Sequence, residues 1–317
     1  MKSGFGLIFL LILTNVHSAW SQENQTKATT EAESSIITAD KTKPVPEVLM
    51  YEKQFENKYS LFAHKRTFIL PISYTDKPSQ DIYAPVTALQ NNVNEPYYQN
   101  LETEFQISFF VPIVRKLALS DWDLNFAYTH HSWWQFYNTG WSKPFRETNY
   151  TPEIFFRYLQ KSELKIFGLK LLGYDLGYMH QSNGQTQLLS RSWDRLYARA
   201  TLTSDEYMLT LTAWARMPEV GPDDNPEILK YMGLGEVLLQ KNINDHSLEA
   251  KVAVSEFANF EMNYSYPWKE GFRWFVSVRT GTGHSLIEFD RGSNRIAMGI
   301  SLDNFFDYRK AAAQSVK

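Results

Sequence analysis

The chain contains no cysteine among its 317 residues. Disulfide bonds, thiolate nucleophiles and cysteine metal sites are therefore excluded, and the sequence carries no sign of its redox compartment. Positive charge is not in excess either, because 32 basic residues stand against 35 acidic ones and the formal net charge is −3. A nucleic-acid-binding surface favours an excess of basic residues. We therefore expect no nucleic-acid partner.

After its N-terminus the chain lacks any apolar run long enough to cross a bilayer as a helix. The N-terminus places Lys2 before a short apolar run, 5–13, and small residues follow. This order is typical of a secretory signal peptide, and the run is too short for a transmembrane anchor. We predict a signal peptide over residues 1–21, with cleavage after Ser18 or Ser21, and an exported chain without membrane helices.

Large apolar residues are scarce between residue 22 and about residue 48, where Thr, Glu, Ser, Lys and Pro dominate. Such a segment cannot bury enough apolar surface to offset the entropy that it would lose on ordering. We predict that residues 22–62 form a flexible N-terminal segment in the periplasm.

Aromatic residues, by contrast, are abundant and make up 15% of the chain. Downstream of the N-terminal segment they alternate with polar residues, as in EFQISFFV, where Phe105 and Ile107 lie opposite Gln106. Side chains at alternate positions share one face of a strand, so each such segment has an apolar wall and a polar wall. The clearest examples are residues 105–111, 121–134, 247–254, 259–266, 272–279 and 295–302.

About twelve alternating segments lie between Thr67 and Leu302, as expected for the tilted ~10-residue strands of an outer-membrane barrel. A soluble β-sandwich also has alternating strands, so alternation alone does not decide between them. Full charges on the opposite faces, Trp and Tyr near strand ends and the export signal favour the barrel. We predict an all-β fold, a transmembrane antiparallel β-barrel of about 12 strands over residues 63–306, followed by a C-terminal tail over 307–317.

Candidate chemistry lies at the end of one predicted strand. The stretch LGYDLGYMHQS brings His180 and Ser182 onto an apolar face, and WDRLYARAT brings Asp194 onto the apolar face of the next strand. In a barrel this wall meets lipid, so the three side chains point towards the membrane. Serine hydrolysis needs a hydroxyl, an imidazole that takes its proton and an acceptor that fixes the imidazole tautomer. The residues therefore indicate hydrolysis of an ester that lies in the bilayer, with backbone N–H groups of the Asn183-Gly184 turn facing the oxyanion.

The same spacing occurs elsewhere in the chain. His130 and Ser132 also lie on an apolar face, where we favour an interface belt beside two tryptophans. His284 and Ser285 are adjacent and lie on opposite faces. Residues i and i+2 of a strand are roughly 7 Å apart at Cα, a gap that a leaning imidazole can close. From the pattern alone, catalysis and a polar strand end capped by a turn fit the candidate pair equally well, while the lack of a Gly-x-Ser-x-Gly elbow disfavours a soluble α/β-hydrolase.

Several motifs resemble the outer membrane phospholipase A family of Gram-negative bacteria: SWWQ, PFRETNYTPEIFF, HQSNG, SRSWDRLY and DDNPEILKYMG. They occur in that family's order, and the similarity extends roughly from Tyr51 to Phe306. The resemblance implies a barrel of the predicted size with a lipid-facing Ser-His-Asn triad, activated by calcium and by homodimerisation.

By position in these motifs, Ser182 matches the nucleophile and His180 the general base, and the N–H group of Gly184 matches the oxyanion site. Asp194 stands where the family commonly has Asn, which implies a Ser-His-Asp triad in this chain. An ionised Asp should hold an imidazolium better than an amide does. An acid that faces lipid is more easily protonated, so the charge state of Asp194 is open.

The resemblance also implies calcium ligands, and calcium takes oxygen donors. Ser142 matches the serine that the family contributes across its dimer, and Ser190 matches the serine after the active-site turn. Gln185 replaces an Arg that ligates through its backbone carbonyl, so this change should be tolerated. Asp224 matches the acid of a second calcium site, which Gln187 should weaken because it replaces an Asp.

Two further differences from the family's sequence pattern concern assembly. His130 stands where the family has a Gln at the dimer seam, and we hypothesise that dimerisation therefore depends on pH. The family's barrel usually ends in a terminal aromatic residue, whereas here Phe306 is followed by the tail 307–317. Either Phe306 still serves as the assembly signal or assembly tolerates the tail.

The sequence thus predicts a calcium-dependent, homodimeric outer membrane phospholipase A with A1, A2 and lysophospholipase activity. Its substrates would be the acyl esters of phospholipids and lysophospholipids. One rival is a non-catalytic pore and another is a barrel whose triad has decayed. The pore would be lined by predicted lumen charges, namely Arg195, Arg199, Arg273, Arg279, Glu249 and Glu261. In so narrow a barrel we expect such mixed charges to pair and fill the lumen.

Overall fold

The computed structural model describes residues 37–44, 61–89, 93–219 and 221–302. The predicted signal peptide and the predicted C-terminal tail lie outside these residues, as does Phe306. Nothing in the structure therefore tests the predicted signal or the assembly role of the C-terminus.

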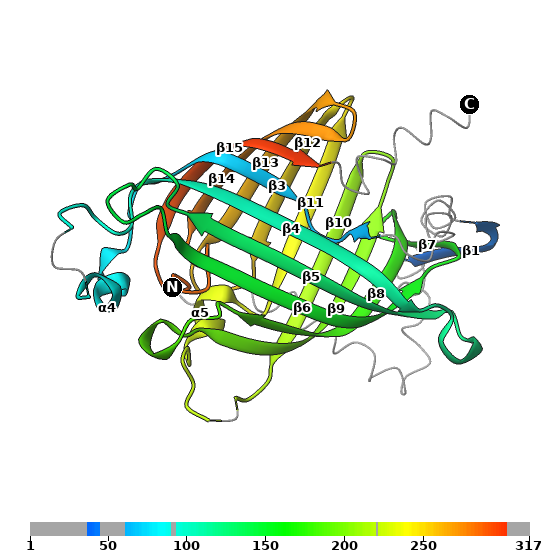
Figure 1. Cartoon of the computed structure of the whole chain (residues 1–317). Helices are drawn as coiled ribbons and strands as arrows, with labels where there is room; N and C mark the ends of the chain where they lie inside the picture. The colour runs from blue at the N-terminus through cyan, green and yellow to red at the C-terminus, as the bar shows by residue number, and fades with distance from the viewer. Residues whose placement is uncertain (1–36, 45–60, 90–92, 220, 303–317) are drawn as a thin grey trace.

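Twelve antiparallel strands form a closed barrel (Figure 1). Each barrel strand pairs with the next one along the chain, and the last strand pairs with the first, which closes the ring. This confirms the predicted transmembrane antiparallel β-barrel of about 12 strands. The strands are β3 (Phe68–Thr75), β4 (Leu101–Val114), β5 (Trp122–Trp134), β6 (Phe145–Leu159), β8 (Leu169–Ser182), β9 (Ser192–Thr203), β10 (Tyr207–Arg216), β11 (Gly235–Ile243), β12 (His246–Ala253), β13 (Asn259–Lys269), β14 (Phe272–Gly281) and β15 (Ser293–Leu302).

The barrel wall is apolar outside and polar inside, the inverse of a water-soluble protein. On β14, Trp274 and Val278 are 50% and 43% exposed, whereas Arg273 and Arg279 on the other face are 6% and 5% exposed. An outer wall of this kind is stable only against hydrocarbon, because water would leave its apolar rows unfavourably hydrated. Among the described residues, no helix combines the length and apolarity needed to cross a bilayer.

The two ends of the barrel have different connections. At one end the links are short, as at 244–245 and 270–271. The other end carries the longer loops, including 76–100, 183–191 and 217–234, with the small helices α4 and α5 (Figure 1). This asymmetry is typical of outer-membrane barrels, whose longer loops face the cell exterior. The short helical elements are η1 (Gln80–Tyr83), α4 (Ala84–Thr87), η2 (Leu117–Leu119), η3 (Gln187–Leu189) and α5 (Ile228–Met232).

A short strand forms within the segment that we predicted to be flexible. β1 (Ile37–Pro44) pairs antiparallel with β7 (Ser162–Ile166), at the end of the barrel opposite α4 and α5 (Figure 1). Strand pairing uses backbone hydrogen bonds and does not require the apolar side chains that this segment lacks. Most of the segment predicted to be flexible lies outside the described residues, and its flexibility stays a prediction.

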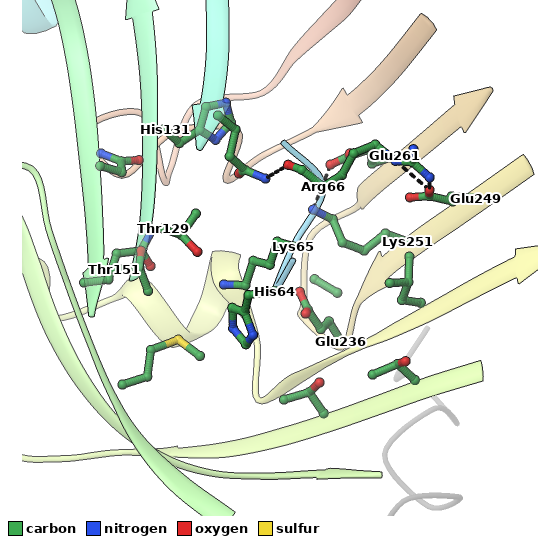
Figure 2. Close-up of a pocket in the computed structure, with 18 of the residues that line it drawn as sticks. His64, Lys65, Arg66, Thr129, His131, Thr151, Glu236, Glu249, Lys251 and Glu261 are labelled. Carbon is green, nitrogen blue, oxygen red and sulfur yellow. Dashed lines mark hydrogen bonds and ion pairs between the residues drawn. The ribbon is translucent and has the colours of Figure 1, made fainter. Parts of the chain in front are cut away.

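The residues just before β3 enter the barrel lumen. β2 (Phe62–Ala63) pairs with β4, and His64, Lys65 and Arg66 follow it. His64 Nε2 and Lys65 Nζ lie 3.0 and 3.1 Å from Glu153 Oε1, and Arg66 pairs with Glu249. Figure 2 shows the three side chains in a cavity of about 430 Å³, with Glu249, Lys251 and Glu261 on one side and Thr129, Thr151 and His131 on the other.

Other lumen charges form ion pairs with one another. Arg279 lies 2.5 Å from Glu104 and 3.5 Å from Glu261, and Arg199 contacts both Glu153 and Asp175. A buried charge that loses its partner is strongly destabilising, so these pairs hold the lumen side chains in place. Four of the six residues that a pore would have used are therefore engaged in ion pairs, namely Arg199, Arg279, Glu249 and Glu261. Arg195 donates instead to Gln181, and Arg273 donates to Ser265.

Candidate active site

The pairing of β8 with β9 places His180 directly opposite Asp194. Both side chains lie on the outer wall, and His180 Nδ1 lies 2.7 Å from Asp194 Oδ1. Their side chains are 34% and 33% exposed. The predicted base and its predicted acid therefore meet on the face that contacts lipid, as the alternation of each strand indicated.

A third side chain, which the sequence analysis missed, completes this contact. The Tyr178 hydroxyl donates a hydrogen bond of 2.6 Å to Asp194 Oδ1, the oxygen that also contacts His180. Tyr178 precedes His180 on the same outward row of β8. Only the register between β8 and β9 brings it to Asp194, and a single strand's pattern carries no such information.

Ser182 lies at the end of β8 on the same outward row, opposite Ser192. Among the described residues no hydrogen bond joins Ser182 to His180, although the predicted spacing is present. The reason is geometric: the backbone places the two Cα atoms roughly 7 Å apart, and the side chains do not lean far enough to close this gap. Catalytic hydrogen bonds are often long before a substrate binds, so the missing contact does not rule out the predicted pair.

The other His-x-Ser pair does form a hydrogen bond. Ser132 Oγ lies 2.9 Å from His130 Nε2 and 2.8 Å from Thr148 Oγ1. However, Ser132 is only 1% exposed, which leaves its hydroxyl inaccessible to an ester. This pair is a hydrogen-bonded polar contact within the outer wall, and its hydroxyl is poorly placed for nucleophilic attack.

The turn after Ser182, residues 183–191, is organised by one buried amide that the sequence analysis also missed. Asn183 Oδ1 accepts hydrogen bonds from the N–H groups of Gln185 and Arg191 at 3.3 and 3.0 Å. Its Nδ2 donates to the carbonyl of Leu189 at 2.8 Å and to Glu147 at 3.3 Å. Within this turn Gly184 has a φ of +65°, a left-handed conformation that favours glycine.

The same turn is fixed to the inside of the barrel. Glu147 accepts hydrogen bonds from Asn149 Nδ2 and from the Ile287 N–H, in addition to Asn183 Nδ2. The loop 282–292 is thereby held beneath the turn, where Leu286 also packs beside Trp193. A polar network inside the barrel thus positions backbone N–H groups beside the outward-facing row.

A model of the phospholipase A1 family matches residues 47–302. The chain belongs to this family.

Curated relatives agree with this assignment. The phospholipase A1 of Salmonella typhimurium is 33% identical over 257 residues, which cover 80% of this chain and 85% of that protein. The phospholipase A1 of Proteus vulgaris is 30% identical with the same coverage, 80% and 85%. Membership of the phospholipase A1 family makes this chain a phospholipase of the outer membrane.

Solved structures of the phospholipase A1 family share its fold. The outer membrane phospholipase A from Escherichia coli superimposes with a TM-score of 0.74 at 28% identity, covering 81% of this chain and 97% of that chain. A Salmonella typhi outer membrane phospholipase dimer with bound calcium gives a TM-score of 0.72 at 28% identity, covering 82% and 99%.

The predicted calcium ligands of this phospholipase lie in three separate loops. Gln185 and Ser190 share the active-site turn, Ser142 is exposed in the β5–β6 loop, and Asp224 is exposed in the β10–β11 loop. Within the described residues the Gln185 carbonyl and the Ser190 hydroxyl have no hydrogen-bond partner, so both oxygens fit the donor type that calcium prefers. The same part of the chain holds no cluster of three or more His, Asp or Glu side chains arranged for a metal ion.

The loop with Asp224 is held by its neighbours. Arg216 contacts Glu219 at 2.8 Å and Asp223 at 2.7 Å. Partial burial raises the pKa of Asp223, but hydrogen bonds from Arg216 and from the Asn225 N–H outweigh it and hold this pKa below its ordinary value. Asp223 is therefore committed to Arg216, whereas Asp224 next to it is exposed to solvent.

The adjacent pair in the 282–292 loop forms no dyad. His284 Nε2 donates to the Ser293 carbonyl at 2.9 Å, while the Ser285 hydroxyl donates to Glu288 at 3.0 Å. Burial and the nearby Arg295 guanidinium lower the pKa of His284 to about 4. The neutral imidazole thus serves the packing of this loop, and the two adjacent side chains point to different partners.

Proposed function

We propose that the chain hydrolyses the acyl esters of membrane phospholipids and lysophospholipids, with Ser182 as nucleophile, His180 as general base and Asp194 as the partner of His180. The observation that carries the proposal is the 2.7 Å contact between His180 Nδ1 and Asp194 Oδ1 on the lipid-facing wall. The hydroxyl of Ser182 follows on the same row. An ester in the outer leaflet would meet this row without leaving the membrane.

The contact assigns the tautomer of His180. Because Nδ1–H donates to Asp194, the lone pair of Nε2 is the one that accepts a proton from Ser182. The Ser182 oxygen then bonds to the ester carbonyl carbon, and His180 returns the proton to the departing alcohol as the ester C–O bond breaks. Water repeats the sequence on the acyl-enzyme, which releases the fatty acid and restores the Ser182 hydroxyl.

Negative charge develops on the carbonyl oxygen in each half of the reaction. The N–H of Gly184 is proposed to donate to this oxygen, since it belongs to the turn that follows Ser182 directly. The side chain of Asn183 keeps the turn rigid, so the donor needs no reorganisation when the charge appears. An ionised Asp194 would offset the positive charge that His180 gains in the same step.

Calcium is proposed as the cofactor, supported by the calcium bound to the Salmonella typhi relative. The Ser190 hydroxyl and the Gln185 carbonyl would hold it, together with Ser142 from a second copy, and Asp224 would serve a second site that Gln187 weakens. When bound, the ion supplies positive charge beside the oxyanion. Calcium takes about 6–8 oxygen ligands. One copy of the turn offers too few, so water and a second copy would complete the site.

A homodimer is proposed from the outer wall itself. His130 lies there between Phe105 and Tyr150, with ring centroids 5.8 and 5.2 Å away, and contacts Ser132. Polar side chains are unfavourable against hydrocarbon, so a second copy is the better neighbour for this patch. The dimer of the Salmonella typhi relative supports the same arrangement.

The deciding experiment measures the hydrolysis of a labelled phospholipid in detergent, with calcium or with a chelator. We expect Ser182→Ala to lower the rate at least about 10³-fold, because the nucleophile is lost. The matched control is Ser132→Ala, which removes the hydroxyl of the other His-x-Ser pair and should leave the rate near that of the parent. The chelator should also suppress the parent's rate.

Full activity in Ser182→Ala would overturn the assignment of the nucleophile. A well-folded parent that hydrolyses no lipid with calcium present would instead favour the decayed barrel. Unchanged activity with the chelator would remove calcium from the proposal and leave the triad intact.

A further inference from the structure

The outward row of β8 carries three polar side chains in succession, Tyr178, His180 and Ser182. The proposed function uses the last two. Tyr178 donates to the same carboxylate oxygen as His180, at 2.6 Å compared with 2.7 Å. Two donors on alternate positions of one strand thus converge on Asp194 Oδ1.

We propose that Tyr178 is a positioning residue of this site, which keeps Asp194 ionised at the lipid boundary and fixes the oxygen that orients His180. This inference rests on the proposed function, because it assigns Tyr178 a role only through Asp194 and His180. Tyr178 itself contacts neither the ester nor the proposed nucleophile.

The need for such a residue follows from the position of Asp194. A carboxylate at the edge of hydrocarbon loses much of its hydration, and this loss favours the protonated acid. A hydrogen bond donated to the ionised form favours that form instead. A protonated Asp194 would no longer offset the charge of a His180 imidazolium, so the Tyr178 hydroxyl sustains the form that catalysis needs.

The other groups near the pair do not replace this donor. On the outer wall near this pair, Tyr150 of β6 is a further titratable side chain, but its ring lies against Gly184. Arg195 acts electrostatically on Asp194 from the next position of β9, but its side chain points into the lumen and donates to Gln181 at 2.9 Å. The N–H of Met217 on the β10 side bonds to the backbone carbonyl of Asp194 and leaves the carboxylate untouched.

Tyr178 contacts the same Asp194 oxygen that faces His180. Its O–H dipole points its positive end at the shared oxygen, close to the ring of His180. Without this hydroxyl, Asp194 would become the neutral acid more readily, and the ionised form that orients His180 would be available over a narrower pH range. The inference therefore predicts a change in the pH profile as well as in the rate.

The test compares Tyr178→Phe with Tyr174→Phe in the phospholipid assay, across pH 5 to 10 and with calcium present. Tyr174 is the matched control because it lies on the same outward row of β8, stacked on Tyr158, and has no contact with Asp194. We expect Tyr178→Phe to lower kcat about tenfold at neutral pH with little change in KM, since one hydrogen bond to a charged group is lost. The acid limb of its profile should move up by about half a pH unit or more, while Tyr174→Phe should match the parent.

The Asp194→Asn background adds a second arm. A neutral amide does not ionise, so it needs no donor to keep it in its working form. In this background Tyr178→Phe should therefore lower kcat less than it does in the parent, and it should not move the acid limb of the pH profile. The folded fraction of each variant is measured by its heat-modifiable mobility, and Tyr178→Leu provides a second variant without the hydroxyl.

Two results would overturn the inference. One is a Tyr178→Phe profile that coincides with that of Tyr174→Phe, and the other is a loss of rate that is equal at every pH and equal in both backgrounds. These differ from failure of the proposed function, in which Ser182→Ala stays active or the parent hydrolyses nothing.

Discussion

At the scale of single residues, the active-site turn depends on a conformation that side chains rarely adopt. Gly184 has a φ of +65°, and a Cβ added there would lie 3.0 Å from Cε2 of Tyr150. Gly168, in the turn between β7 and β8, has a φ of +77° and open space around the same position. The two glycines thus share a left-handed conformation that would strain an alanine. They differ in location, so the cost to stability and the effect on hydrolysis can be separated.

We expect Gly184→Ala and Gly168→Ala each to lower the free energy of unfolding by about 1–2 kcal/mol, the cost of a left-handed conformation for alanine. Gly184→Ala should also lower hydrolysis by at least about tenfold, because the displaced turn moves the proposed oxyanion donor. The measurements are urea unfolding in detergent and the phospholipid assay. Equal activity of the two variants would contradict the role assigned to Gly184.

Residue roles were predictable wherever one strand's alternation decides them. His180, Ser182 and Asp194 were assigned to the outer wall from period-two patterning, and the structure places all three there. Tyr178 and Asn183 were missed, because their roles depend on partners on another strand or across a turn. Identifying a tyrosine as a donor to an acid requires the register of two strands, which one strand's sequence does not contain.

At the scale of elements, the loop 282–292 is a structural support for the active-site turn. The Leu286 N–H group donates to the Asn149 side chain, and the Ile287 N–H group donates to Glu147. Glu147 also accepts a hydrogen bond from the Asn183 side chain. His284 within this loop stays neutral because burial and Arg295 lower its pKa to about 4 from an ordinary 6.5. The stability of the loop should therefore respond to pH.

The direction of this pH dependence follows from the number of protons that the folded and unfolded chains bind. Between pH 6.5 and about 4 the unfolded chain binds a proton at His284 and the folded chain does not, so stability falls as pH decreases through this range. We expect a loss of up to about 3 kcal/mol, measured by hydrogen exchange of the loop or by urea unfolding. His284→Gln should remove most of this dependence, whereas His246→Gln, at an exposed histidine of β12, should not.

A separate contribution is expected at lower pH. Burial raises the pKa of Glu288, but Arg146 and Arg295 outweigh it and hold this pKa below its ordinary 4.5. The stability from Glu288 is present above pH 4.5 and is lost as pH falls through its lower folded value. A transition that starts only below pH 4.5 in the parent would mean that His284 contributes nothing.

At the scale of the whole molecule, the lumen decides between an enzyme scaffold and a pore. His64, Lys65 and Arg66 enter the cavity and pair with Glu153 and Glu249 (Figure 2). On the wall, Arg199 and Arg279 are likewise ion-paired with acids. A lumen filled by paired charges is a poor path for ions.

In planar bilayers we therefore expect no sustained ion-selective current from the parent. The combined Lys65→Ala and Arg66→Ala variant should show brief cation-selective openings, because it leaves Glu153 and Glu249 with fewer cations. Lys161→Ala, which removes an exposed partner of Asp121, is the control and should behave as the parent does. A steady current from the parent, together with no lipid hydrolysis, would favour the pore.

Assembly of two barrels is also a property of the whole molecule. If His130 lies at the seam between two copies, its protonation would bring positive charge into an apolar contact and weaken the dimer. We expect the association constant to fall by about tenfold between pH 8 and pH 5.5, measured by sedimentation in detergent. His130→Gln should abolish this change, and an association constant that is the same at both pH values would remove the hypothesis.

The sequence by itself determined the barrel and the wall on which each side chain lies, because alternation is a local property of each strand. Only the tertiary structure decided which residues meet. The register of β8 against β9 brings Tyr178 to Asp194, and chain closure brings Arg66 to Glu249. Contacts between residues far apart in the chain depend on how the strands align and close, and no single segment encodes that alignment.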